Sequence, residues 1–106
     1  IMNNETKNFK TLSTEDFNEL IKNNEVTIID IRDQDSFNHS HISGAINLSN
    51  DNVDDFINST PKHETLLFYC YHGVSSQGAA QHFCNLGFKN VYSLDGGYTQ
   101  YSKDNI

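Results

Sequence analysis

The chain has 106 residues, enough for one domain with a modest hydrophobic core. Charged residues make up 20% and hydrophobic residues 36%, a balance typical of globular rather than disordered proteins. The formal net charge of -7 argues against nucleic acid and anionic membrane surfaces as partners. No apolar segment is long enough to span a bilayer, and the N-terminus shows no secretory signal pattern.

Two cysteines, Cys70 and Cys84, are too few for a small disulfide-stabilised secreted domain. The sequence therefore indicates a reducing, cytoplasmic setting. Residues 1–106 are expected to form a single domain, in which Ile1, which precedes Met2, is set aside as a remnant before the native start.

The first half of the chain alternates apolar runs with helix signals. In order, it predicts a short strand over 9–12, a helix from Ser13 or Thr14 to about Asn23, a central strand over 26–31, a helical turn around 35–38 and a strand over 44–48. The helix has Phe17, Leu20 and Ile21 on its apolar face.

The second half continues the alternation. It predicts a helix over 51–58, a strand over 65–69, a helix over 76–86 ended by Gly87, a strand over 91–94 and a terminal helical turn. The helix over 51–58 is expected to face inward through Val53, Phe56 and Ile57. This order predicts a small α/β domain with a mostly parallel central sheet and helices on both faces.

A candidate nucleophile follows the apolar run over 66–69, where Cys70 begins a short polar loop with one glycine. Such a run is typical of a buried strand, and the serines after the loop indicate a helix start. Cys70 is therefore expected at the carboxyl end of a strand and near the positive end of a helix, where α/β sheets bind ligands. A thiol there loses its proton readily, so we expect a nucleophilic cysteine in an anion cradle.

Three separate stretches resemble the rhodanese (sulfurtransferase) domain. They are Ile28-Ile29-Asp30-Ile31-Arg32-Asp33 followed by Phe37 and His41-Ile42-Ser43-Gly44-Ala45-Ile46-Asn47, then the loop CYHGVSS from Cys70 to Ser76, then Leu94-Asp95-Gly96-Gly97-Tyr98. In order and spacing they cover most of the chain, which makes the match far more specific than a lone CxxG. The loop is most similar to that of the small, single-domain bacterial GlpE-type thiosulfate sulfurtransferases.

The resemblance implies a reaction. In the family, the loop cysteine attacks the sulfane sulfur of thiosulfate, becomes a persulfide and releases sulfite. A thiophilic acceptor then takes the sulfur, which would be cyanide in assays and a small or protein thiol in cells. Cys70 would be the catalytic residue, and no cofactor is implied.

The remaining loop residues would bind the substrate and the persulfide: Tyr71, His72, Gly73, Val74, Ser75 and Ser76. Their backbone N–H groups would face the negative sulfur, and Gly73 would permit a positive φ. Ser75 and Ser76 could donate hydroxyl hydrogen bonds or cap the helix. The run Gly78-Ala79-Ala80 would let that helix approach the sheet closely.

The loop departs from the commonest family pattern, in which arginines follow the cysteine and precede the last serine. Tyr71 and Ser75 stand there, and Arg32 is the only arginine of the chain. The resemblance makes Arg32 structural, paired with a nearby carboxylate. Asp30, His41 and Asp95 are the other expected supports, although Asp95 could equally cap the last helix.

Some residue roles stay open. His72 could act as an acid–base or anion partner, or could simply face solvent. Cys84 is expected to pack in the core rather than to act as a second redox group. The spacing of Cys70 with His63, His72 and His82 matches no zinc site, so no metal is expected.

Three other functions compete with the sulfurtransferase. A phosphatase or arsenate reductase of the same fold needs a longer loop and an arginine where Ser76 stands. A non-catalytic interaction module is disfavoured by the presence of Cys70. A persulfide carrier that serves a partner protein cannot be separated from the enzyme by sequence.

Overall fold

The computed structural model describes residues 8–105, so the expectation for Ile1 lies outside the described residues. Within this range the strands form one five-stranded sheet in the order β1-β5-β4-β2-β3. The strands are β1 (Lys10–Leu12), β2 (Thr27–Asp30), β3 (Ile46–Asn47), β4 (Thr65–Tyr69) and β5 (Asn90–Leu94). Every pairing is parallel, which confirms the predicted sheet and makes it fully rather than mostly parallel.

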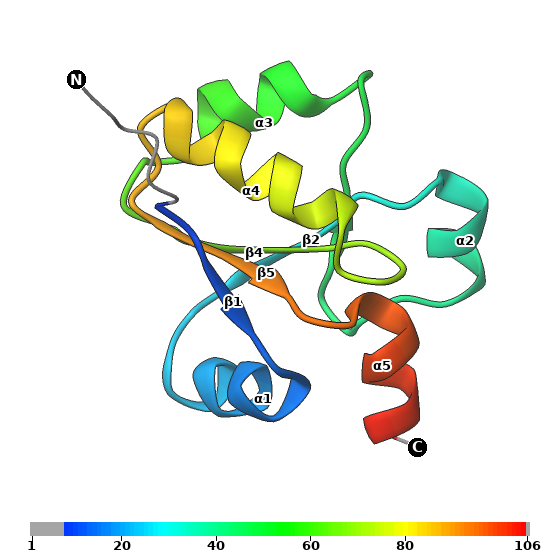
Figure 1. The fold of residues 1–106 in the computed structure, drawn as a ribbon. Coiled ribbons are helices and arrows are strands. Elements are labelled where there is room, and N and C mark those ends of the chain that lie inside the picture. The colour runs from blue at the N-terminus through cyan, green and yellow to red at the C-terminus, as the bar shows by residue number, and fades with distance from the viewer. Residues whose placement is uncertain (1–7, 106) are drawn as a thin grey trace.

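Helices cover both faces of the sheet, as predicted (Figure 1). α3 (Val53–Ser59) and α4 (Ser75–Asn85) lie over one face, while α1 (Thr14–Asn23) and α5 (Gly97–Asp104) lie against the other. The short helix α2 (Gln34–His39) follows the carboxyl end of β2. Among residues 8–105, no helix is both long and apolar enough to cross a membrane.

The central strand β4 shows why two helical layers form. Residues 66–69 of this strand are fully buried, because neighbouring strands and helices enclose it on all sides. Leu66 and Phe68 face the core beneath α3 and α4, whereas Leu67 and Tyr69 face the core beneath α1 and α5. The strand therefore ends among buried side chains, at the edge of the sheet from which Cys70 emerges.

Two details of the predicted helices were wrong. Ile21 keeps 39% of its surface exposed, because the core contact of α1 centres on Phe17 and the apolar stripe is narrower than expected. Gly78 faces outward, and a Cβ there would meet no atom within 4 Å. Ala80 is the residue that meets the sheet, since positions two apart lie on nearly opposite sides of a helix.

The final helix is longer than the predicted turn. α5 runs from Gly97 to Asp104, and its rings pack under the sheet through Tyr98 and Tyr101. The turn before α5 needs its two glycines, because φ is +74° at Gly96 and +58° at Gly97. This turn places the N-terminal end of α5 in contact with Cys70 and Tyr71 at the start of the loop.

Candidate active site

Cys70 lies at the carboxyl end of β4, immediately before the loop over 71–74 that leads into α4. Its side chain is largely buried, with 6% of the residue exposed. The adjacent strands run in the same direction, so the carboxyl ends of β2, β4 and β5 meet at this edge. Ligands bind at this edge in open α/β sheets.

Several donors converge on the sulfur of Cys70. The backbone N–H groups of Gly73 and Ser76 donate to Sγ at 3.2 and 3.3 Å. The thiol also lies 3.4 Å from the hydroxyl of Ser76, which in turn is 2.8 Å from the hydroxyl of Ser93. The sulfur therefore sits in a small hydrogen-bonded cage that can receive negative charge.

The cage stabilises the thiolate. Burial by itself raises the pKa of the Cys70 thiol, but hydrogen bonds from the Ser76 side chain and from backbone N–H groups of Ser76, Gly73 and His72 outweigh it. The pKa of Cys70 is therefore lowered from its ordinary value. The N-terminus of α4 adds its partial positive charge on the same side.

The serines do not cap α4. The N-cap residue is Val74, which has no side-chain cap hydrogen bond. Ser76 is fully buried and directs its hydroxyl to Cys70 and Ser93 instead. Ser75 is exposed, and within residues 8–105 its hydroxyl makes no hydrogen bond. The alternative that these serines cap α4 was therefore wrong, because the buried hydroxyl of Ser76 lies at the Cys70 sulfur.

Gly73 meets two demands at once. Its φ is +87°, a region that side-chain-bearing residues avoid. A Cβ at this position would lie 2.8 Å from the backbone nitrogen of Gly96 and 3.0 Å from the carbonyl oxygen of Leu94. The close neighbour is thus the turn between β5 and α5, which packs directly against the loop.

That turn holds the start of the loop through the backbone. The N–H groups of Tyr98 and Thr99 donate to the carbonyl oxygens of Cys70 and Tyr71, at 2.8 and 3.0 Å. A Cβ on Gly97 would lie 2.5 Å from both of these carbonyl oxygens, so the contact needs glycine.

Asp95 contributes to this turn through its backbone. Its N–H donates to the carbonyl of Leu12 at 2.7 Å. The N-cap of α5 is Gly96, so the capping alternative for Asp95 was wrong. Within the part of the chain that the structure describes, the Asp95 carboxylate has no hydrogen bond, so its contribution to the turn is made by the backbone.

Arg32 and Asp30 form a buried ion pair beside the loop. Nη2 of Arg32 lies 2.7 Å from Oδ2 of Asp30, and both side chains are almost completely buried. The same Nη2 donates to the carbonyl of Ser40 at 2.6 Å. Burial lowers the pKa of Arg32, but the hydrogen bond and charge of Asp30 outweigh it, so the pKa is raised.

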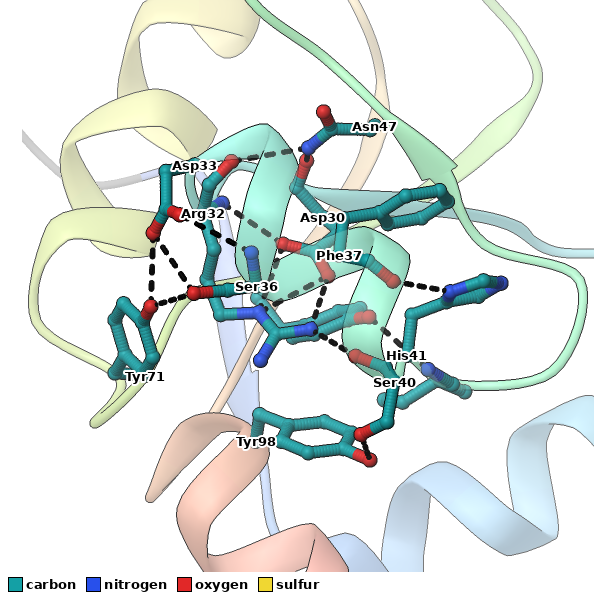
Figure 2. A network of polar contacts seen from close by, with 12 residues as sticks. Asp30, Arg32, Asp33, Ser36, Phe37, Ser40, His41, Asn47, Tyr71 and Tyr98 are labelled. Carbon is teal, nitrogen blue, oxygen red and sulfur yellow. Dashed lines mark hydrogen bonds and ion pairs between the residues drawn. The ribbon is translucent and has the colours of Figure 1, made fainter.

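Aromatic rings enclose the guanidinium of this ion pair (Figure 2). The Arg32 Cζ atom lies 4.3 Å from the ring centre of Tyr98, 5.4 Å from that of Tyr71 and 5.6 Å from that of Tyr69. These rings come from α5, the loop and β4, so the ion pair joins three parts of the site. Tyr69 also accepts the N–H of Ile42 at 3.1 Å, and burial raises its pKa.

His41, His72 and Cys84 do not contact the sulfur with their side chains. Nδ1 of His41 lies 2.7 Å from the carbonyl oxygen of Phe37, and the His41 ring stacks on the Phe37 ring. The side chain of His72 is exposed. Cys84 lies on the core-facing side of α4, where burial raises the pKa of its thiol. Among residues 8–105, no group of three or more His, Cys, Asp and Glu residues is placed to hold a metal.

Sequence reasoning missed two groups that shape the site. Ser93 is a buried serine in β5, and its position between Tyr92 and Leu94 in the strand beside β4 is a signal that could have been used. Asp33 and Ser36 contact the hydroxyl of Tyr71 across 38 and 35 residues of sequence, and no local pattern points to that contact.

The fold and the loop define the class of the protein, a parallel α/β domain with a cysteine loop at the carboxyl end of its central strand. The family model described as "Rhodanese-like domain" matches residues 13–104. The chain therefore belongs to the rhodanese-like domain family, which confirms the resemblance found from the sequence.

Curated relatives are similar over nearly the whole chain. Thiosulfate sulfurtransferase GlpE from Shewanella oneidensis is 46% identical over 97 residues, covering 92% of this chain and 96% of the relative. The protein of the same name from Coxiella burnetii is 43% identical over 90 residues, covering 85% and 84%. The crystal structure of a rhodanese-related protein from Thermoplasma volcanium shares the fold with a TM-score of 0.78 at 20% identity, covering 92% and 94%.

Proposed function

We propose that the chain is a thiosulfate sulfurtransferase that works through a persulfide on Cys70. The observation that carries the proposal is the convergence of the Gly73 and Ser76 N–H groups on the Cys70 sulfur, at 3.2 and 3.3 Å. Support also comes from relatives that are 43–46% identical and are named thiosulfate sulfurtransferases.

The reaction has two balanced steps. The Cys70 thiolate attacks the outer sulfur of thiosulfate, forms an S–S bond and breaks the bond to the departing sulfite, which leaves with its electron pair. The persulfide anion then gives its terminal sulfur to cyanide, forming thiocyanate and regenerating the thiolate. A thiol acceptor would take the same sulfur in cells. No external oxidant or reductant is needed in the steps with thiosulfate and cyanide.

The loop geometry suits both charged states of the cysteine. A thiolate and a persulfide both need donors that cannot themselves react, and backbone N–H groups are such donors. Ser76 and Ser93 add a hydroxyl pair that can reorient as charge moves.

A phosphate-clamping role has no support from this loop. Such a clamp needs a guanidinium that faces the ligand. Arg32 is the only arginine in the sequence, and its guanidinium is engaged with Asp30 and the carbonyl of Ser40. A second candidate function is a carrier that passes its persulfide to a partner protein, and the lack of an arginine in the loop supports it.

Both cysteines are free thiols, which suits a reducing, cytosolic setting, and we propose that location as well.

Intact-mass spectrometry after thiosulfate treatment tests the proposal. The protein should gain the mass of one sulfur atom and lose it again with cyanide. Cys70→Ser should show neither change, whereas Cys84→Ala, the matched control, should retain both. Sulfur transfer at an undiminished rate by Cys70→Ser would contradict the assignment. A persulfide that cyanide cannot remove would instead favour the protein carrier.

A further inference from the structure

Tyr71 directly follows the candidate nucleophile, and its backbone is fixed from one side only. Its carbonyl oxygen accepts the N–H of Thr99 at 3.0 Å, which holds it to the start of α5. On the opposite side of the loop, among the described residues, no backbone hydrogen bond joins the loop over 71–74 to α2. Whatever fixes the loop toward α2 must therefore be a side chain.

The Tyr71 side chain makes that connection (Figure 2). Its hydroxyl donates to Oδ1 of Asp33 at 2.8 Å, and it is also hydrogen bonded to the hydroxyl of Ser36. Asp33 is the N-cap of α2 and accepts the N–H of Ser36 at 3.1 Å. The ring of Tyr71 lies against the guanidinium of Arg32, 5.4 Å from Cζ to the ring centre.

Burial does not explain this tyrosine. The residue is 42% exposed, so its ring is not needed to fill a core. Its hydroxyl nevertheless has a carboxylate acceptor, and the hydrogen bonds of Asp33 with Tyr71 and Ser36 hold the pKa of that carboxyl below its usual range. The acceptor is thus charged at neutral pH, and hydrogen bonds to charged groups are the stronger ones.

We propose that Tyr71 is a positioning residue, which ties the Cys70 loop to the N-cap of α2 and thereby keeps the loop N–H groups aimed at the sulfur. The proposal rests on the proposed sulfur transfer at Cys70. The distance between loop and helix is set by a rigid ring with one polar end. Without the hydroxyl, α5 still holds the carbonyls of Cys70 and Tyr71, and Gln77 still donates to the carbonyl of Gly73 at 2.9 Å. The loop would lose its side-chain tie to α2, so its N–H groups would be aimed less precisely at the sulfur.

The test uses Tyr71→Phe, which removes the hydroxyl and keeps the ring over Arg32. The Cys84→Ala background leaves Cys70 as the single thiol. The rate of alkylation by iodoacetamide is followed against pH, because a change that affects only stability does not move the midpoint of that profile. We expect the midpoint to rise, and kcat/KM with thiosulfate to fall about fivefold, as for the loss of one preorganised hydrogen bond.

Two further variants separate the causes. Asp33→Asn keeps a good N-cap for α2 but removes the charge of the acceptor, so it should move the midpoint in the same direction by less. Tyr92→Phe removes a tyrosine hydroxyl from β5, away from the loop, and should leave the profile and the activity unchanged.

An unmoved midpoint and unchanged kcat/KM in folded Tyr71→Phe would overturn the proposal. If that variant does not fold, an unmoved midpoint in Asp33→Asn would overturn it instead. The alkylation arm does not use thiosulfate, so failure of the proposed function and failure of the positioning role give different results. If the proposed function fails, the protein without substitutions forms no persulfide with thiosulfate. If the positioning role fails, the midpoint of the alkylation profile does not move in Tyr71→Phe.

Discussion

At the scale of single residues, Gly73 shows how tightly the loop is fitted to its surroundings. Its φ of +87° and the 2.8 Å approach that a Cβ would make to the Gly96 nitrogen are separate constraints. Gly87 has a φ of +100°, but a Cβ there would meet nothing within 4 Å. A side chain at Gly87 would cost only the strain of a positive φ, whereas a side chain at Gly73 would add a steric clash to that strain.

Gly73→Ala should lower kcat/KM by at least tenfold, because relief of the clash must displace either the loop or the turn that supports it. It should also destabilise the protein by about 2 kcal/mol, whereas Gly87→Ala should cost about 1 kcal/mol from φ alone and keep its activity. Urea unfolding and steady-state kinetics check both variants. Equal activity losses in the two would show that the close packing at Gly73 has no special role.

The buried Asp30–Arg32 ion pair is also tightly fitted to its surroundings, in this case through its charges. Both groups are desolvated, so the attraction between them is set against a large cost of removing them from water. The rings of Tyr69, Tyr71 and Tyr98 complete the enclosure around the guanidinium. Removal of one partner leaves the other as an unpaired buried charge.

Asp30→Asn should therefore reduce the free energy of unfolding by about 3 kcal/mol, as for other broken buried pairs. The exposed pair Glu19–Lys22 provides the control, since both of its side chains are more than 60% exposed. Glu19→Gln should change stability by less than about 0.5 kcal/mol. Chemical unfolding curves measure the two effects, and a loss below 1 kcal/mol in Asp30→Asn would mean that Arg32 finds another partner or water.

At the scale of elements, the sequence predicts the strands and the loop well because their signals are local. The run over 66–69 is uniformly apolar, since β4 is covered on both faces, and Cys70 follows it directly. The glycines at 73, 96 and 97 indicate turns, and each of them has a positive φ. These patterns suffice to place a thiol at the carboxyl edge of the sheet.

The supports of the site could not be predicted because they depend on contacts between distant elements. Ser76 meets Ser93 only because β4 and β5 are adjacent, and the choice between capping α4 and bonding the sulfur depends on that contact. Tyr71 reaches Asp33 only because α2 follows β2 at the same edge. A single sequence gives residue types at these positions, but not the direction of their side chains.

At the scale of the whole molecule, the net charge of the chain has the same sign as the charge of thiosulfate. Thiosulfate is a dianion and the protein carries a formal charge of -7, so the long-range field does not draw it inward. The loop offers backbone N–H groups and hydroxyls, and the guanidinium of Arg32 is already paired with Asp30. We therefore expect weak ground-state binding of thiosulfate and a stable persulfide, which is covalent and hydrogen bonded.

Ser75→Arg tests this balance, because Ser75 is the exposed first residue of α4 and directly precedes Ser76, whose N–H donates to the sulfur at 3.3 Å. The new cation should raise kcat/KM for thiosulfate several-fold, mainly through a lower KM, as expected for a partly exposed contact of about 1 kcal/mol. Added salt should shrink the gain, since exposed charges are screened over about 10 Å at 0.1 M ionic strength. Ser75→Gln is the neutral control of similar length, and a thermal unfolding curve checks the small cost of a cation at a helix N-terminus. If KM stays unchanged in folded Ser75→Arg at low salt, charge does not limit the loop, and a thiol persulfide or a partner protein becomes the better candidate for the sulfur donor.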